Sequence, residues 1–140
     1  MLTLIPASRA HMPFREALLA DAATMAYNAP WCPPDGTLAF PEADWDAWLA
    51  RWTDREPERF CGYVLGESNT PVGEVCWYGH GAGMSVVIHA DHRGHGYGAQ
   101  ALQLLLARAF SHPEIARLEN TFESTRSAAM RIHLDAGFMV

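Results

Sequence analysis

The chain has 140 residues, the length of one ordinary domain, which argues against an enzyme with separate cofactor and substrate lobes. Apolar residues make up 49% of it and charged residues 19%, enough to bury a continuous core and too hydrophobic for a disordered segment. The formal net charge is −6 and all ten basic residues are arginine, so lysine chemistry is excluded and nucleic acid is not expected as a partner.

The sequence shows no membrane span, secretory leader or cysteine-based site. No stretch approaches the roughly 18 uninterrupted apolar residues of a span, and residues 1–10 lack the basic start and long apolar middle of a leader. We therefore expect a cytoplasmic protein without a membrane partner. Neither a disulfide framework nor a metal knuckle is predicted from the three widely spaced cysteines, Cys32, Cys61 and Cys76.

The first part of the chain predicts one strand followed by two helices. Leu2–Ile5 is a short apolar run that Pro6 ends, which is typical of a strand. Pro13–Tyr27 and Pro41–Arg55 are helical in composition, and a proline-rich loop separates them. The second helix places apolar residues on one face at helical spacing, namely Trp45, Trp48, Leu49 and Trp52.

Beyond residue 60 the apolar period changes from helical to alternating. Phe60–Glu67 and Val72–Tyr78 predict an antiparallel hairpin, and Met84–His89 predicts a third strand of this kind. A glycine cluster at 94–98 then opens a helix with an apolar stripe. Its members are Leu102, Leu105, Leu106, Ala109 and Phe110.

The last part of the chain predicts a strand at Leu118–Phe122, a helix at Arg126–Ala136 with Gly137 as its cap, and the start of a strand at Phe138–Val140. No repeat or linker interrupts this order. We therefore predict a single α+β domain over residues 1–140, with a central mixed sheet, antiparallel through its first four strands, and helices on both faces.

The glycine cluster is the most informative segment. Glycines at 94, 96 and 98 let backbone approach a ligand closely, and the following helix directs its unpaired N–H groups and positive dipole end to the same place. Such a loop binds anions, phosphate above all, and Arg93 adds a positive charge. A tight turn with no ligand and a dinucleotide fingerprint remain alternatives, whereas a Walker loop is excluded because no lysine follows.

Two motifs resemble the GNAT superfamily of N-acetyltransferases. Arg93-Gly-His-Gly-Tyr-Gly98 is similar to the family's Gln/Arg-x-x-Gly-x-Gly/Ala signature, and a helix ending in Gly137-Phe138 resembles its second recognisable segment, at the expected distance. Residues 25–28 and 40–45 resemble some bacterial members. The resemblance implies an acyltransferase that transfers acetyl from acetyl-CoA to a primary amine by direct attack. Acetyl-CoA would be the cosubstrate, and no metal would be needed. The acceptor would be a small molecule or a peptide.

The resemblance also implies cosubstrate contacts. In the family, backbone amides of the signature loop hold the pyrophosphate, and one amide of the preceding strand polarises the thioester carbonyl. By match, the strand residues are Val86, Val87 and Ile88, and the loop residues are Arg93, Gly94, His95, Gly96, Tyr97, Gly98 and Ala99. Plain core packing is the alternative for the strand residues, and the two roles are compatible because backbone and side chains point in different directions.

On the last helix this sequence departs from the family. Arg126 stands where many relatives carry an asparagine that contacts CoA, and His133 stands where many carry a tyrosine that protonates the leaving thiolate. Their spacing of seven keeps both on one helical face. An arginine can bind phosphate and a histidine can act as an acid, so both roles are carried over; a structural histidine is the alternative for His133.

No general base is evident, because residues 84–88 hold no titratable side chain. Glu74 on the preceding strand is the predicted base, with Glu119, Glu123 or water as alternatives. The unusual acid and the missing base keep a noncatalytic acyl-CoA-binding module as a second functional hypothesis. If the alternation holds, Glu74 and Cys76 share one face of the sheet, and Val75 lies on the other.

Three further expectations concern the surroundings of this site. The histidines at 89, 92 and 95 beside Asp91 suggest a metal, but their loop already has a phosphate role and no metal is expected. An acceptor pocket is the functional alternative to core packing for Tyr27, Trp31, Phe40 and Trp45. The chain lacks most of the closing strand pair that relatives carry after Phe138, so a homodimer could cover that edge.

Overall fold

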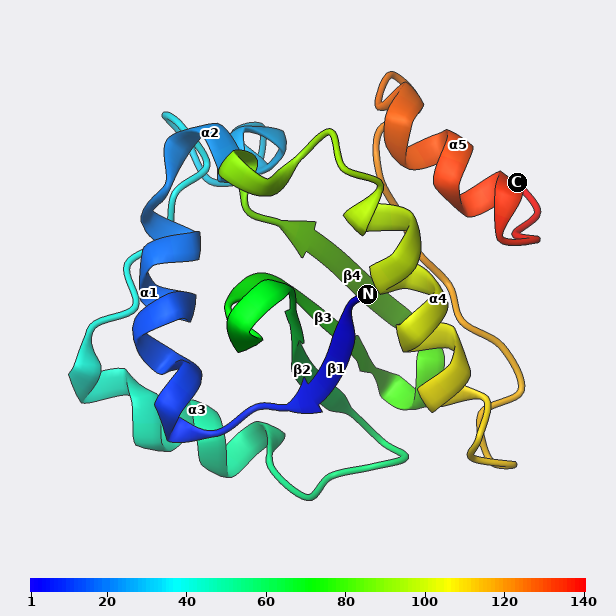
Figure 1. The fold of residues 1–140 in the computed structure, drawn as a ribbon, viewed down its shortest axis with the longest axis horizontal. Helices are drawn as coiled ribbons and strands as arrows, with labels where there is room; N and C mark the ends of the chain where they lie inside the picture. The colour runs from blue at the N-terminus through cyan, green and yellow to red at the C-terminus, as the bar shows by residue number, and fades with distance from the viewer.

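The computed structural model describes residues 1–140 and contains one four-stranded sheet (Figure 1). The strands lie in sequence order and every neighbouring pair is antiparallel. They are β1 (Thr3–Pro6), β2 (Phe60–Leu65), β3 (Pro71–Tyr78) and β4 (Gly83–Ile88). The α+β architecture predicted from the sequence is confirmed, and the first four strands are antiparallel as expected.

Helices cover both faces of the sheet. Figure 1 shows α1 and α3 on one side and α4 and α5 on the other. Their bounds are α1 (Met12–Ala20), α2 (Ala22–Met25), α3 (Trp45–Trp52), α4 (Tyr97–Ala109) and α5 (Ser127–Asp135). No helix is long and apolar enough to cross a membrane.

The alternation along the strands divides the interior into two cores. On β2, Val64 packs in a core with the apolar face of α4, whereas Tyr63 packs in a second core with residues of α1 and α3. On β3, Val75 belongs to the α4 core, and Glu74 shares the opposite face with Tyr63, its partner across the ladder. This confirms the predicted separation of Glu74 from Val75. All three cysteines are free thiols.

The first predicted helix is broken in two. Asp21 takes an extended conformation (φ −85°, ψ 109°), which ends α1, and its carboxylate accepts the Thr24 N–H at 3.0 Å. Asp21 is therefore the N-cap of α2. The Asp-x-x-Thr spacing carried this signal in the sequence. The second predicted helix is shorter than expected, because a 3-10 turn at Glu42–Asp44 precedes α3.

The strand predicted at Leu118–Phe122 does not form, and neither does a strand at Phe138–Val140. Only one ladder-like bond joins the first segment to the sheet region, from the Glu119 N–H to the Gly81 carbonyl at 2.9 Å. Beyond this bond the chain does not pair with β4, and residues 120–122 line a cleft instead. The sheet is consequently antiparallel throughout, not mixed, and the outer edge of β4 is unpaired.

A charged cluster ties α4 to the loop before β2. Arg108 Nη2 lies 2.7 Å from one carboxylate oxygen of Glu56, and His112 Nε2 lies 2.7 Å from the other. Burial opposes ionisation of this carboxylate, but the hydrogen bonds from Arg108 and His112 outweigh it and lower the pKa of Glu56. The lowered pKa means that ionised Glu56 stabilises the folded state.

We expect Glu56→Gln to lower the free energy of unfolding by about 1 kcal/mol at pH 7, discounted because the pair is partly exposed. Since the folded pKa is the lower one, this stabilisation is present above the unfolded pKa of glutamate and is lost as pH falls through the folded value. Urea denaturation across that range should show the gap closing. Glu119→Gln is the control, because the Arg117 pair is largely exposed and should contribute nothing measurable.

Candidate active site

A cleft of about 740 Å³ opens beside the unpaired edge of β4. Residues 84–88 of β4 form one wall, and the glycine loop with the first turn of α4 forms one end. Residues 23–27, the extended segment 120–122 and the inner face of α5 complete it. The cleft therefore occupies the place beside β4 where the sequence predicts a strand at residues 118–122.

The glycine loop has the backbone expected of an anion site. Gly94 (φ +84°) and Gly96 (φ +76°) both lie in the left-handed region, and a Cβ at either would meet no atom within 4 Å. The first bond of α4 runs from Gln100 N–H to the Gly96 carbonyl at 3.3 Å, so the preceding amides have no acceptor within the helix. These free N–H groups and the positive end of α4 face the cleft, an arrangement that favours phosphate.

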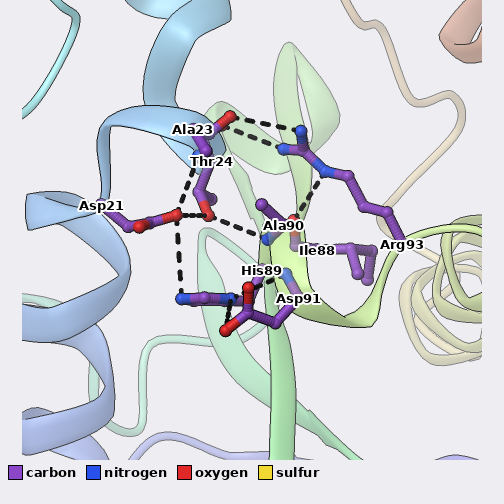
Figure 2. Close-up of polar contacts among 8 residues, drawn as sticks. All are labelled: Asp21, Ala23, Thr24, Ile88, His89, Ala90, Asp91 and Arg93. Carbon is purple, nitrogen blue, oxygen red and sulfur yellow. Dashed lines mark hydrogen bonds and ion pairs between the residues drawn. The ribbon is translucent and has the colours of Figure 1, made fainter.

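The Arg93 side chain is directed to the protein backbone. Figure 2 shows its guanidinium reaching from the loop to α2. Nε donates to the Ile88 carbonyl at 3.1 Å, Nη2 to the Thr24 carbonyl at 3.0 Å and Nη1 to the Ala23 carbonyl at 3.4 Å. The sequence predicts that this side chain adds positive charge for an anionic ligand, but three of its five N–H groups donate to backbone carbonyls. These bonds fasten the loop to α2 and hold the guanidinium against that helix.

Thr24 completes the connection between α2 and the loop (Figure 2). Its hydroxyl oxygen accepts the Ala90 N–H at 2.9 Å, and the hydroxyl proton is donated to Asp21. The Thr24 hydroxyl and N–H bonds lower the pKa of Asp21, which also faces His89 Nε2 at 3.8 Å. Because Thr24 is 1% exposed, its hydroxyl has no water as a substitute partner.

Thr24→Val is expected to lower the free energy of unfolding by about 1–3 kcal/mol, because the Ala90 N–H loses its acceptor. The turn leading to Arg93 should loosen as well, so acetyl-CoA affinity should fall together with stability. Urea denaturation and calorimetry measure the two effects. Thr37→Val is the matched control, since Thr37 makes the same pair of bonds to Asp35 at the surface and touches no part of the loop. Equal effects of the two variants would contradict the connecting role.

His133 lies buried in the wall of the cleft, 5% exposed, against the rings of Phe122 and Phe138. Its Nδ1 is 2.7 Å from the Ala129 carbonyl, and its Nε2 is 3.0 Å from Asn120 Nδ2. A carbonyl can only accept, so Nδ1 carries the proton and Nε2 accepts from Asn120 in the neutral ring. An acid role therefore requires the doubly protonated ring, with Nε2 as the donating atom.

Glu74 does not line the cleft. It is 7% exposed beneath α1, accepts a hydrogen bond from the Tyr63 hydroxyl at 2.9 Å and lies 3.0 Å from Arg15 Nε as an ion pair. Burial raises the pKa of Glu74, although Arg15 and Tyr63 counteract it. Its role as base stays a prediction, and it would need a relay to a substrate in the cleft.

Arg126 lines the cleft and packs against two aromatic rings. Its guanidinium carbon is 4.6 Å from the ring centroid of Tyr27 and 5.6 Å from that of Phe122. All three side chains line the cleft, so Arg126 joins the N-terminus of α5 to the segment after α2. Burial raises the pKa of Tyr27, and the nearby Arg126 charge counteracts it.

Most of the predicted cosubstrate residues line the cleft, and so does His133. The cleft-lining members are Val86, Val87, Ile88, Arg93, Gly94, Gly96, Tyr97, Gly98, Ala99 and Arg126. The exposed His95 side chain lies outside and packs on Tyr97, with ring centroids 5.5 Å apart. Sequence reasoning missed Asn120 and Thr24; only the latter carried a signal, as part of the Asp21 cap.

The histidines of the loop do not converge. His89 Nδ1 accepts the Asp91 N–H at 3.1 Å, and the rings of His89 and His92 meet edge to face. No group of three or more His, Cys, Asp or Glu side chains in the structure is placed to hold a metal ion. Of the aromatic residues considered for an acceptor pocket, Tyr27 lines the cleft, Phe40 and Trp45 pack in the α1 core, and Trp31 is exposed.

The fold matches a large set of solved structures. A spermidine N-acetyltransferase of Vibrio cholerae, in complex with CoA and spermine, is 15% identical with a TM-score of 0.80, over 99% of this chain and 80% of that one. A GNAT-family acetyltransferase of Streptococcus pneumoniae is 13% identical with a TM-score of 0.81, over 100% and 85% of the two chains. An aminoglycoside acetyltransferase in complex with coenzyme A and kanamycin is 16% identical with a TM-score of 0.71, over 99% and 84%.

A comparison with curated protein sequences gives no match. The model of the acetyltransferase (GNAT) domain family, however, matches residues 1–139, which is nearly the whole chain. This agrees with the glycine loop, the free edge of β4 and the helix closing in Gly137. The chain therefore belongs to the acetyltransferase (GNAT) family of enzymes.

Proposed function

We propose that the protein transfers acetyl from acetyl-CoA to a primary amine by direct attack. One observation carries the proposal: a phosphate-type loop at the start of α4 continues into a cleft along an unpaired strand edge. Acetyl-CoA supplies the activated acetyl group as a thioester. A diphosphate at the loop and an extended arm along β4 would place that group beside backbone donors.

The loop residues fit the diphosphate. Because Gly94 and Gly96 carry no Cβ and nothing stands above them, phosphate oxygens can approach the backbone closely. The amides from Gly94 to Ala99 would hold them at the positive end of α4. The Arg93 side chain is not needed to bind the diphosphate, because its bonds to backbone carbonyls hold the loop in place.

The alternation of an antiparallel ladder selects the amide that faces the thioester. His89 N–H donates to the Val72 carbonyl on β3, so the amides two and four residues earlier also turn to β3. The Val87 amide is thereby committed, and those of Val86 and Ile88 face the free edge. Of these, Val86 lies further from the loop, and we assign it to polarise the carbonyl of the thioester.

Two proton transfers complete the reaction. The leaving thiolate would take its proton from Nε2 of His133. This is the one titratable side chain of α5 among the residues that line the cleft. The amine proton would pass to water, because the predicted base Glu74 does not line the cleft and its Oε2 is bound to both Arg15 and Tyr63. If Glu74 receives it in the end, the route runs through that water.

Calorimetry with acetyl-CoA and a thiol assay for CoA release over a panel of amines test this function. We expect acetyl-CoA binding and amine-dependent CoA release. Binding without turnover for any amine would instead favour the noncatalytic acyl-CoA module, and absence of binding at millimolar acetyl-CoA would contradict both. The predicted homodimer is tested separately by size-exclusion chromatography with light scattering.

A further inference from the structure

The charged side chains that line the cleft are all basic. Among the 26 lining residues there is no aspartate or glutamate. Two acidic side chains on neighbouring elements are bound within the protein: Asp21 accepts from Thr24, and Glu74 contacts Arg15 and Tyr63. A substrate amine in this cleft therefore meets no carboxylate on its walls.

Arg126 is the lining arginine whose guanidinium makes no polar contact within the protein. The other, Arg93, donates three of its five N–H groups to backbone carbonyls, which fix the position of its guanidinium. Arg126 is half-buried, and its guanidinium makes no ion pair and no hydrogen bond within the protein. A positive charge held in a cleft wall without a partner attracts an anionic group.

The aromatic neighbours of Arg126 orient it. The guanidinium carbon of Arg126 lies over the faces of the Tyr27 and Phe122 rings. Contacts of this kind leave the N–H groups at the edge of the guanidinium free. Those edge donors form the fork that binds a carboxylate through two parallel hydrogen bonds. Arg126 contacts the wall built by residues 23–27, whereas the diphosphate site has its own donors in the glycine loop.

Resting on the proposed acetyl transfer, we propose that the acceptor is an amine that also carries a carboxylate, of the amino-acid type, and that Arg126 binds this carboxylate. The amine is then left to face β4, where the Val86 amide would hold the thioester carbonyl. Polycationic amines are poor acceptors on this view, because they would meet Arg126 and no opposing carboxylate. The chain would differ in this from its structural neighbours, whose complexes contain spermine and kanamycin.

The test compares acceptors that differ only in the carboxylate. L-alanine, L-leucine and L-phenylalanine are each paired with the corresponding amino-acid amide, and spermidine and kanamycin complete the panel. For wild type we expect kcat/KM about tenfold to a hundredfold higher for the acid than for the amide of the favoured pair. The amide has the less basic amine, so easier deprotonation cannot produce this preference.

Arg126→Gln should bring the acid and the amide to within about threefold of each other, with the KM for acetyl-CoA unchanged to the same degree. Arg131→Gln is the matched control, since it removes the same charge from an exposed position on α5 outside the cleft. It should keep the full preference. Thermal unfolding of both variants shows whether α5 remains packed.

Three results would overturn the proposal. The amides could react as well as the acids, the polycations could be the best acceptors, or Arg126→Gln could raise the KM for acetyl-CoA and leave the acid preference intact, which would assign Arg126 to the cosubstrate. If no probe is acetylated, titration of the acid and amide pairs into the CoA-saturated protein decides, and equal affinities overturn it. Failure of acetyl-CoA itself to bind defeats the proposed function instead, so the two failures are distinct.

Discussion

Gly96→Ala is expected to weaken acetyl-CoA binding about tenfold or more. The residue has φ +76°, and an alanine in this region costs about 1–2 kcal/mol, while its methyl group would stand above the amides proposed to hold the diphosphate. The loop would either relax away from its anion-binding conformation or keep it and present a methyl group to the phosphate. Calorimetry with acetyl-CoA measures the loss.

Gly137→Ala provides a matched control for strain alone. Gly137 also has a left-handed backbone (φ +99°), and a Cβ there would meet nothing within 4 Å, but it caps the far end of α5 outside the cleft. Both variants should lose similar stability, and only Gly96→Ala should lose affinity. Similar affinity losses in the two would mean that general destabilisation, and not the loop, sets the binding of acetyl-CoA.

His133→Gln is expected to lower kcat about a hundredfold and to leave the KM for acetyl-CoA within a few-fold of wild type. Glutamine can replace the hydrogen bonds to Ala129 and Asn120 but cannot donate a proton to the thiolate. Steady-state kinetics of CoA release with the best amine measures the effect. His80→Gln, at an exposed histidine in the turn between β3 and β4, serves as the control and should be silent.

A second measurement separates an acid from a packing residue, because His133 lies among Phe122 and Phe138. When the thiol of a thioester donor is strongly acidic, it departs as a stable thiolate and needs no proton. With such a donor the variant should therefore recover most of the wild-type rate. If the loss is the same with both donors, His133 acts only through packing. If kcat with acetyl-CoA changes less than threefold, the thiolate leaves without its help.

Local patterns predicted the elements whose side chains have one period and one partner. The alternation in residues 60–88 predicted three strands correctly. Their side chains pack into cores on the two faces of the sheet, and each strand pairs with one that is adjacent in sequence. The glycines at 94 and 96 gave the loop because left-handed backbone and an open surface favour glycine. These constraints act within a few residues, so they can be predicted from the sequence.

Other features depended on contacts between distant segments. Residues 118–122 have the composition of a strand, but a strand needs a partner along its length, and here a single bond joins the segment to Gly81 in the turn before β4. Arg93 carries the charge of a phosphate ligand, but carbonyls of α2, about seventy positions earlier in the chain, take its donors. Glu74 has the chemistry of a base, but Arg15 and Tyr63 bury it beneath α1.

The sequence by itself thus determined the α+β order of elements, the glycine loop before α4 and the family that both resemble. The tertiary structure decided which contacts each polar group makes: Arg126 and His133 line the cleft, Arg93 is held by backbone carbonyls, and Glu74 is paired with Arg15 away from the cleft. Backbone conformation is set by neighbours along the chain. The availability of a charge is set by the partners that folding brings within hydrogen-bonding distance, and no local pattern records them.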